Sequence, residues 1–296
     1  MLSARYSCST AAPGCGRGLG VLPKFFSLFL FCGVAALSGC GSPKQPFVTP
    51  ERLERGLVLV LPGIEGRSYL NEHICQGLSA GGVNWAIEIF DWTSKYGPLY
   101  NQRAQETNRR KAQDIADRIG RYKLAFPDRP VMLVGHSGGG AMAVWTAEVL
   151  GPEQTIEGAV LINPSLSPQY PLGGALGKTK RGIVLFYSPK DWVLLGIGTR
   201  VYGTMDGLHS VSAGYVGFEI PTDRPRIYRK LYQIGWTKDM ARAGNSGSHL
   251  SSAAARFVSR YVAPLVLAEK WSKNYMTRVK AQDMIHTTGS PSESPE

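Results

Sequence analysis

Short apolar runs alternate with longer, helix-like segments from residue 56 onward. Five of the runs end in turn residues: Gly56–Leu61, Trp85–Phe90, Val131–Val134, Ala159–Ile162 and Ile183–Tyr187. Their nearly continuous apolar character is typical of strands buried on both faces, as in parallel sheets. A more polar run, Ile227–Trp236, is expected to be the last strand.

The segments between these runs are long enough to form helices. They are Ser68–Ala80, Asn101–Leu124 and Gly140–Leu150, and Ser252–Ala268 is expected to be a closing helix. Strands that alternate with helices imply βαβ crossovers. The sequence therefore predicts the α/β class, with a mostly parallel, doubly wound sheet and helices on both faces.

One motif in this pattern carries chemistry. Gly135-His136-Ser137-Gly138-Gly139 matches G-x-S-x-G, directly after the run Val131–Val134 and before a segment rich in small residues. A strand, a sharp turn and a helix are what a nucleophile elbow requires. Glycines flank the serine because the turn is strained and neighbouring chain comes close. A nucleotide-binding turn is disfavoured, since neither G-x-G-x-x-G nor G-x-x-x-x-G-K-[ST] occurs.

With this motif in this context, the chain resembles the α/β-hydrolase family over roughly residues 56–268. The resemblance implies the order serine, acid, histidine, with the acid after the second strand beyond the nucleophile. That strand is Ile183–Tyr187, so the resemblance points to Asp191, which also begins a D-x-V step. Later aspartates remain as alternatives: Asp206, Asp223 and Asp239.

The family places its base in a loop between the last strand and the closing helix. His249, within Gly247-Ser248-His249-Leu250, occupies that position. His209 lies between the last two strands and is the alternative. The other histidines are less suited: His73 precedes the elbow, His136 faces away from the serine hydroxyl, and His286 lies in the tail.

An oxyanion hole needs two backbone N–H donors. One is expected from Gly138, the residue after the nucleophile. By resemblance the other comes from Ile64, in the loop that follows the first strand. The family often has His-Gly at this loop, whereas this chain has Pro62-Gly63. Glu65, one residue further, is expected to cap the following helix rather than to contact substrate.

The implied activity is that of a serine hydrolase, esterase- or lipase-like, with an acyl-enzyme intermediate. A same-fold acyltransferase, thioesterase or peptidase would use the same triad, and a catalytically inactive lipoprotein scaffold is the alternative from another class. No metal or organic cofactor is expected, since H-E-x-x-H and Cys/His clusters are lacking. Residues 165–181 look too rich in Gly and Pro for a large lid, and residues 192–225 are expected to line the substrate site.

The first 39 residues are organised like a signal peptide. A basic region ends at Lys24, and the apolar run Phe25–Leu37, 13 residues long, is too short to span a bilayer. The tetrad Leu37-Ser38-Gly39-Cys40 resembles a bacterial lipobox, which implies that Cys40 is lipidated and anchors an exported protein in the cell envelope. Gly41, rather than Asp, favours the outer membrane if the cell is Gram-negative.

The cysteines and the charge agree with this organisation. Cys8, Cys15 and Cys32 would be removed and Cys40 acylated, so only Cys75 would remain and no disulfide is expected. The net charge is +11, of which three positive charges precede Cys40, leaving +8 on the mature chain. Without a zinc finger, arginine-rich arm or aromatic–basic pattern, nucleic acid is not an expected partner.

These observations divide the chain into four parts. Residues 1–39 are expected to be the signal peptide, 40–55 a tether, 56–283 the α/β-hydrolase domain and 284–296 a disordered tail. The expected partners are an ester substrate and, through Cys40, the membrane. The acyl and alcohol groups and the oligomeric state are not specified by the sequence.

Overall fold

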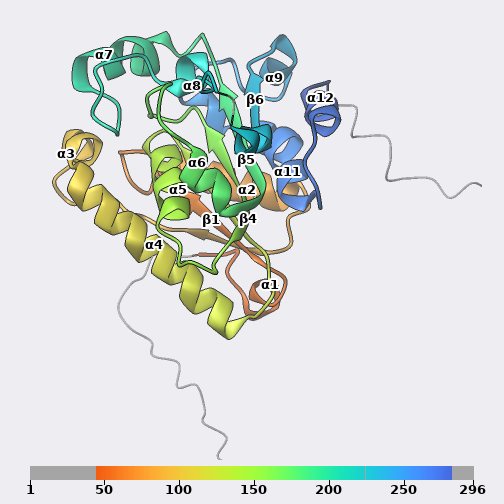
Figure 1. Ribbon diagram of the computed structural model, residues 1–296. Coiled ribbons are helices and arrows are strands. Elements are labelled where there is room, and N and C mark those ends of the chain that lie inside the picture. Colours follow the sequence, from red (N-terminus) through yellow and green to blue (C-terminus); the bar gives the residue numbers. More distant parts are fainter. Residues whose placement is uncertain (1–44, 224, 282–296) are drawn as a thin grey trace, which may run out of the picture. The chain divides into compact units, whose positions relative to one another are not determined.

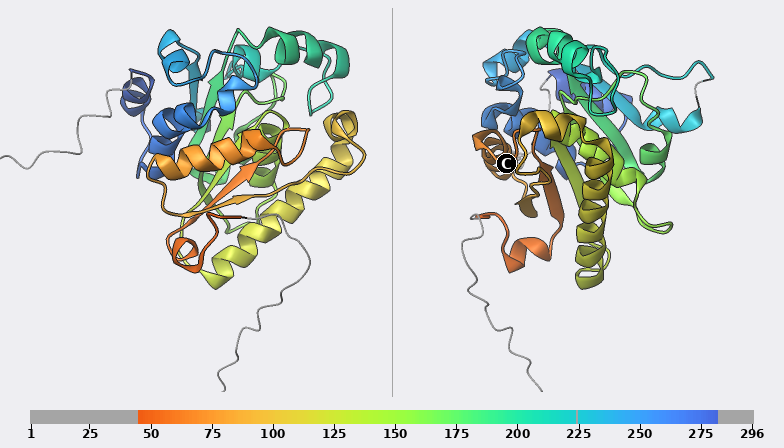
Figure 2. Two further views of the ribbon diagram at one scale, coloured as in Figure 1. Left: turned by 180° about the vertical axis from the view of Figure 1, so that it is seen from behind. Right: turned by 90° about the vertical axis from the view of Figure 1, so that its left-hand side faces the viewer.

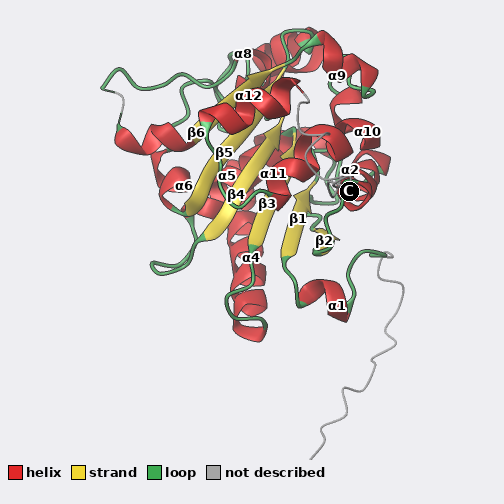
Figure 3. Cartoon of the chain, turned by 90° about the vertical axis from the view of Figure 1, so that its right-hand side faces the viewer, coloured by secondary structure: helices red, strands yellow, loops and turns green. Residues whose placement is uncertain are grey.

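The computed structural model describes residues 45–223 and 225–281 (Figure 1). Its centre is a six-stranded sheet with the order β2-β1-β3-β4-β5-β6, in which all neighbouring strands are parallel. The strands are β1 Leu57–Leu61, β2 Ala86–Ile89, β3 Val131–His136, β4 Ile156–Ile162, β5 Thr179–Tyr187 and β6 Leu231–Gly235. Figure 3 shows this order across the sheet.

Helices cover both faces of the sheet. Figure 1 shows α4 (Gln105–Ala125), α5 (Gly138–Glu148) and α6 (Gly173–Gly177) on one face. The view from behind in Figure 2 shows α2 (Tyr69–Ala80) and α11 (Ala263–Leu267) on the other. This is the doubly wound α/β-hydrolase fold that the sequence predicts.

The period-two alternation of each strand separates two cores. Leu59 and Leu133 pack with α4 and α5, whereas Val60 and Val134 pack with α2 and the C-terminal helices. All four side chains are fully buried. Strands buried on both faces explain why the apolar runs in the sequence are continuous rather than alternating.

The chain passes from β1 outward to β2 and then crosses back to β3. The strand order therefore reverses between β1 and β3, which lie side by side with Leu57 opposite Val131 and Leu61 opposite Gly135. In open α/β sheets, ligands bind at the carboxyl ends of the strands at such a switch point. The loops after β1 and β3 meet there.

Three predicted elements differ from the observed ones. Asn101–Leu124 is two helices, α3 (Pro98–Arg103) and α4, which Ala104 separates with φ −79° and ψ 59°. The closing helix is interrupted because Pro264 has no N–H to donate and Val258–Val262 forms a π-helical turn. In the last predicted strand, Arg226–Lys230 is a 3-10 helix, so β6 begins only at Leu231.

The remaining helices are short. They are α1 Pro50–Leu53, α7 Thr199–Tyr202, α8 Ala213–Val216, α9 Lys238–Arg242, α10 Ala255–Phe257 and α12 Lys273–Ala281, with a π-helical turn at Trp192–Gly198 and a 3-10 turn at Ser251–Ala253. Residues 165–181 contain only α6 as a helix, in keeping with the expectation of no large lid there. None of the described helices combines the length and the apolarity that a bilayer-crossing segment requires.

The segment before β1 packs on the domain from Gln45 onward. The Gln45 side chain accepts a hydrogen bond from the Ile89 N–H (3.1 Å) and donates one to the Ile89 carbonyl (2.8 Å). The Phe47 carbonyl accepts from the Ile87 N–H at 3.1 Å. Residues 45–55, assigned to a tether from the sequence, thus carry α1 and contact β2. The expected signal peptide, Cys40 and the tail from residue 284 lie outside the described residues.

Candidate active site

Ser137 sits at a strained turn between β3 and α5. Its φ of 55° and ψ of −122° lie in a region that residues with a Cβ rarely adopt. Such a conformation costs on the order of 1–3 kcal/mol and persists only where its surroundings enforce it. Here the Ser137 N–H donates to the Ile162 carbonyl (3.0 Å), and its own carbonyl accepts from Gly140 (2.9 Å) and Ser165 (3.1 Å).

The glycines of the motif are required by close backbone packing. A Cβ on Gly135 would overlap the Gly139 carbonyl, and one on Gly139 would overlap the carbonyl oxygens of Leu61 and Pro62. The elbow therefore lies directly against the loop after β1, with no side chain between them. The G-x-S-x-G spacing follows from this packing.

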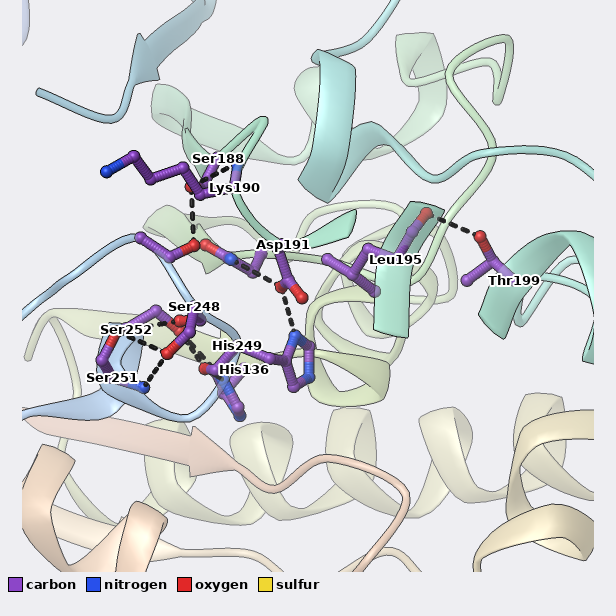
Figure 4. A network of polar contacts seen from close by, with 12 residues as sticks. His136, Ser188, Lys190, Asp191, Leu195, Thr199, Ser248, His249, Ser251 and Ser252 are labelled. Atoms are coloured by element: carbon purple, nitrogen blue, oxygen red, sulfur yellow. Dashed lines mark hydrogen bonds and ion pairs between the residues drawn. The ribbon is translucent and has the colours of Figure 1, made fainter. Parts of the chain in front are cut away.

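Asp191 and His249 form a short, buried hydrogen bond. His249 Nδ1 lies 2.6 Å from Asp191 Oδ2, and these residues are 9% and 3% exposed (Figure 4). Since a carboxylate accepts, Nδ1 carries the proton and Nε2 is left able to take one. Asn163 Nδ2 donates to the same Asp191 oxygen at 2.9 Å. The acid is therefore fixed by two donors from different loops.

The strand ends place these residues at one edge of the sheet. Asp191 follows β5, and its N–H donates to the Ser188 carbonyl at 3.0 Å. Ser188 Oγ donates to the Gly247 carbonyl at 2.7 Å, which ties the loop of His249 to the end of β5. Among the described residues Ser137 Oγ makes no hydrogen bond, and catalytic bonds of this kind often tighten only when substrate is bound.

Two of the alternative acids and the alternative base have other contacts, and Asp223 is exposed. Asp206 accepts hydrogen bonds from Ser167 N (2.9 Å) and Oγ (2.5 Å), and Asp239 pairs with Arg242 at 2.8 Å. His209 Nδ1 lies 3.2 Å from the Arg200 carbonyl. Of the aspartates and histidines with described hydrogen bonds, only Asp191 and His249 are joined to each other.

Gly138 and Ile64 lie next to each other at the switch point. An ideal Cβ on Gly138 would be 3.4 Å from the Ile64 nitrogen and 2.8 Å from its Cγ2. Trp92 Nε1 donates to the Pro62 carbonyl (2.8 Å) and Asn101 Nδ2 to the Ile64 carbonyl (2.9 Å), which fixes this loop. Gly138 also opens α5, whose N-terminus favours negative charge. The backbone of Ile64 and that of Gly138 therefore lie close together, at the place where the sequence predicts the two donors.

Glu65 does not cap α2, which corrects the expectation from the sequence. The N–H of Ser68, at the start of that helix, donates to Asn71 Oδ1 at 2.8 Å, so Asn71 supplies the cap. The Glu65 carboxylate lies against Gly63 and accepts a hydrogen bond only from the Ser68 hydroxyl, at 3.5 Å, among the described side chains. Although the residue is exposed, partial desolvation raises the pKa of its carboxyl, and the nearby His249 opposes that shift.

Asn163, which donates to the Asp191 carboxylate, is not among the site residues predicted from the sequence. Asn163 has φ 46° and follows β4, the neighbour of the elbow strand. An asparagine at the carboxyl end of a central strand, followed by Pro164, was the available signal. In the described part of the chain no cluster of three or more His, Cys, Asp or Glu side chains could hold a metal ion.

Comparison with known proteins gives distant structural similarities. No family model matches the sequence, and no curated protein matches it. Est1E from Butyrivibrio proteoclasticus has 11% identity over 74% of this chain and 88% of its own, with a TM-score of 0.44. The esterase domain of a Rhodothermus marinus protein has 16% identity over 74% and 88%, with a TM-score of 0.43.

Aspergillus fumigatus lipase B has 9% identity over 78% of this chain and 57% of its own, with a TM-score of 0.46. These similarities are too distant to transfer a role to any residue of this chain. The roles proposed for the site residues therefore rest on their geometry alone.

Proposed function

We propose that this protein is a serine hydrolase that cleaves carboxylic esters through an acyl-enzyme on Ser137. The observation that carries the proposal is the 2.6 Å bond between His249 and Asp191, at the sheet edge where Ser137 is held at a strained turn. A serine hydroxyl is a weak nucleophile at neutral pH and needs a base that is itself oriented by a third group. The bond from His249 to Asp191 supports the proposal because it orients a base in this way.

The proposed reaction has two steps. His249 Nε2 takes the proton of Ser137 as Oγ attacks the ester carbonyl, and the resulting oxyanion accepts hydrogen bonds from the Ile64 and Gly138 N–H groups. The tetrahedral intermediate collapses with loss of the alcohol, which receives the proton from His249. Water then attacks the acyl-enzyme by the same route and releases the acid. Asp191 stabilises the imidazolium in both steps.

We further propose that the mature chain begins at Cys40, is lipidated there and is anchored in the cell envelope. The lipobox-like tetrad and the apolar run of 13 residues support this. Expression with a clickable palmitate analogue is expected to label the wild-type chain and to leave a Cys40→Ser variant unlabelled. Equal labelling of the two chains would contradict the anchor without affecting the hydrolase proposal.

A fluorophosphonate probe tests the proposed activity. Residues 45–223 and 225–281 pack around two cores of their own, so a chain starting at Lys44 is suitable. The probe is expected to label this chain and to leave Ser137→Ala and His249→Ala unlabelled. Ser167→Ala is the matched control, because this buried serine also bonds an aspartate, Asp206, but lies outside the proposed triad.

Two outcomes decide the proposal. Labelling that depends on Ser137 and His249 but not on Ser167 would establish an activated serine, and a series of p-nitrophenyl esters of increasing chain length would then define the acyl preference. Absence of labelling in a chain with a folded circular dichroism spectrum would refute the hydrolase and favour a non-catalytic envelope scaffold.

A further inference from the structure

The residue before the nucleophile contacts the loop of the base. His136 is the last residue of β3 and is fully buried. Its Nε2 lies 3.1 Å from the His249 carbonyl oxygen and 3.1 Å from Ser252 Oγ, while Ser252 Oγ donates to that carbonyl at 2.6 Å (Figure 4). The two imidazole rings lie 4.8 Å apart, centroid to centroid.

The hydrogen-bond partners define the tautomer of His136. A carbonyl oxygen can only accept, so the proton must be on Nε2. Nδ1 is buried and has no partner among the described residues, as expected for the bare nitrogen of a neutral ring. Burial, with a smaller contribution from the neighbouring His249, lowers the pKa of His136 to about 3. The ring is therefore a fixed, neutral donor at ordinary pH.

The loop that receives this bond has little regular structure of its own. Between α9 and the turn at Ser251–Ala253 it contains two glycines with positive φ, Gly244 (93°) and Gly247 (96°). Such glycines give a chain conformational freedom that folding must remove. Ser188, after β5, bonds the loop at Gly247, and His136, at the end of β3, bonds it at His249. These two hydrogen bonds thus connect the loop to the end of β5, which precedes Asp191, and to the end of β3, which precedes Ser137.

We propose that His136 is a positioning residue: its hydrogen bond holds the loop that carries His249 next to the nucleophile elbow. His136 and Ser137 are adjacent in the chain, so the Nε2–H bond to the His249 carbonyl fixes the base relative to the nucleophile through one short path. This inference rests on the proposed function, and His136 itself contacts neither the substrate nor a transferred proton. The alternative to this positioning role is that His136 contributes to the stability of the fold and to nothing else.

Substitutions at position 136 separate these roles. Gln places an amide N–H near the position of the imidazole Nε2, whereas Leu fills much of the space without a donor. His136→Leu is expected to lower the second-order rate of fluorophosphonate labelling about 100-fold, the scale of loss when a reacting group is misplaced by about 1 Å. His136→Gln is expected to recover most of that rate.

Hydrogen–deuterium exchange supplies a readout that does not depend on activity. In His136→Leu the amides of residues 245–253 are expected to exchange faster than in wild type, and in His136→Gln they are not. Ile119→Ala is the control, because Ile119 is buried in the core on the opposite face of the sheet. It is expected to lower global stability without changing labelling at a temperature well below unfolding, or local exchange in this loop.

The outcomes distinguish this inference from the proposed function. Absence of wild-type labelling would refute the hydrolase itself. Wild-type labelling that His136→Leu leaves unchanged would overturn only the positioning role. The positioning role would also be overturned if His136→Leu lost labelling without faster exchange in residues 245–253, or if Ile119→Ala lost labelling to the same extent. Loss with Leu, recovery with Gln and a matching change in exchange would support it.

Discussion

Lowering the pH from 7 to 5 is expected to destabilise the fold through His136. The pKa of this histidine is 6.5 when it is solvated and about 3 in the buried site, because burial penalises the imidazolium. The folded chain therefore stays neutral at position 136 while the unfolded chain takes up a proton below pH 6.5. This contribution to stability is fully present above pH 6.5 and is lost as the pH falls toward 3.

The size of the effect follows from the difference in proton binding. Each pH unit between the two pKa values removes about 1.4 kcal/mol from the free energy of unfolding. At pH 5 the loss attributable to His136 is thus about 2 kcal/mol relative to pH 7, a large part of the 5–15 kcal/mol that is typical of proteins.

Urea unfolding of wild type and His136→Gln isolates this contribution. Gln cannot titrate, so the other ionisable groups contribute similarly to both chains and cancel in the difference between their free energies of unfolding. We expect the wild-type advantage over the variant to shrink by about 2 kcal/mol between pH 7 and pH 5. A difference that stays constant over this range would refute the neutral, buried state of His136.

Three further predictions concern other residues. Gly139→Ala is expected to lower the free energy of unfolding, measured by urea titration, by about 3 kcal/mol, because the new Cβ would overlap backbone carbonyls. An unchanged urea midpoint would contradict that packing. Asp191→Asn is expected to remain folded while its labelling rate falls about 10⁴-fold, since the amide favours the wrong tautomer of His249, and a loss under tenfold would argue against its role as the acid. In a chain beginning at Lys44, Cys75 is expected to resist iodoacetamide at pH 8 in the folded state and to react in urea, because burial raises its pKa to about 12. Rapid alkylation of the folded chain would indicate opening of α2.

The strands could be predicted where they are buried on both faces. The apolar runs in the sequence predict β4 from Ala159 and β5 from Ile183, whereas these strands begin at Ile156 and Thr179. The missing parts contain charged residues, since Glu157 pairs with Lys180 (2.8 Å) and Arg181 (3.3 Å) between the two strands. Ion pairs across a sheet leave no apolar signal in either strand alone.

The sequence points to Ser137 and Asp191 because each follows a strand, and to His249 through the family resemblance. The contacts that support these residues could not be predicted, because they join residues far apart in the chain. Asn163 and Asp191 are 28 residues apart in the sequence, and His136 and His249 are 113 apart. A pattern of a few residues does not encode such pairs. The π-helical turn at Trp192–Gly198 likewise has no signal in the local sequence.

The pairing of Gln45 and Phe47 with β2 has a consequence for the behaviour of the protein in solution. β2 is an edge strand, and open N–H and C=O groups on an edge are a template for pairing with another chain. Gln45 occupies the N–H and carbonyl of Ile89, and Phe47 occupies the N–H of Ile87. A chain shortened to begin after Phe47 would therefore keep the proposed triad but expose a strand that invites self-association, whereas one that begins at Lys44 carries its own protection against aggregation.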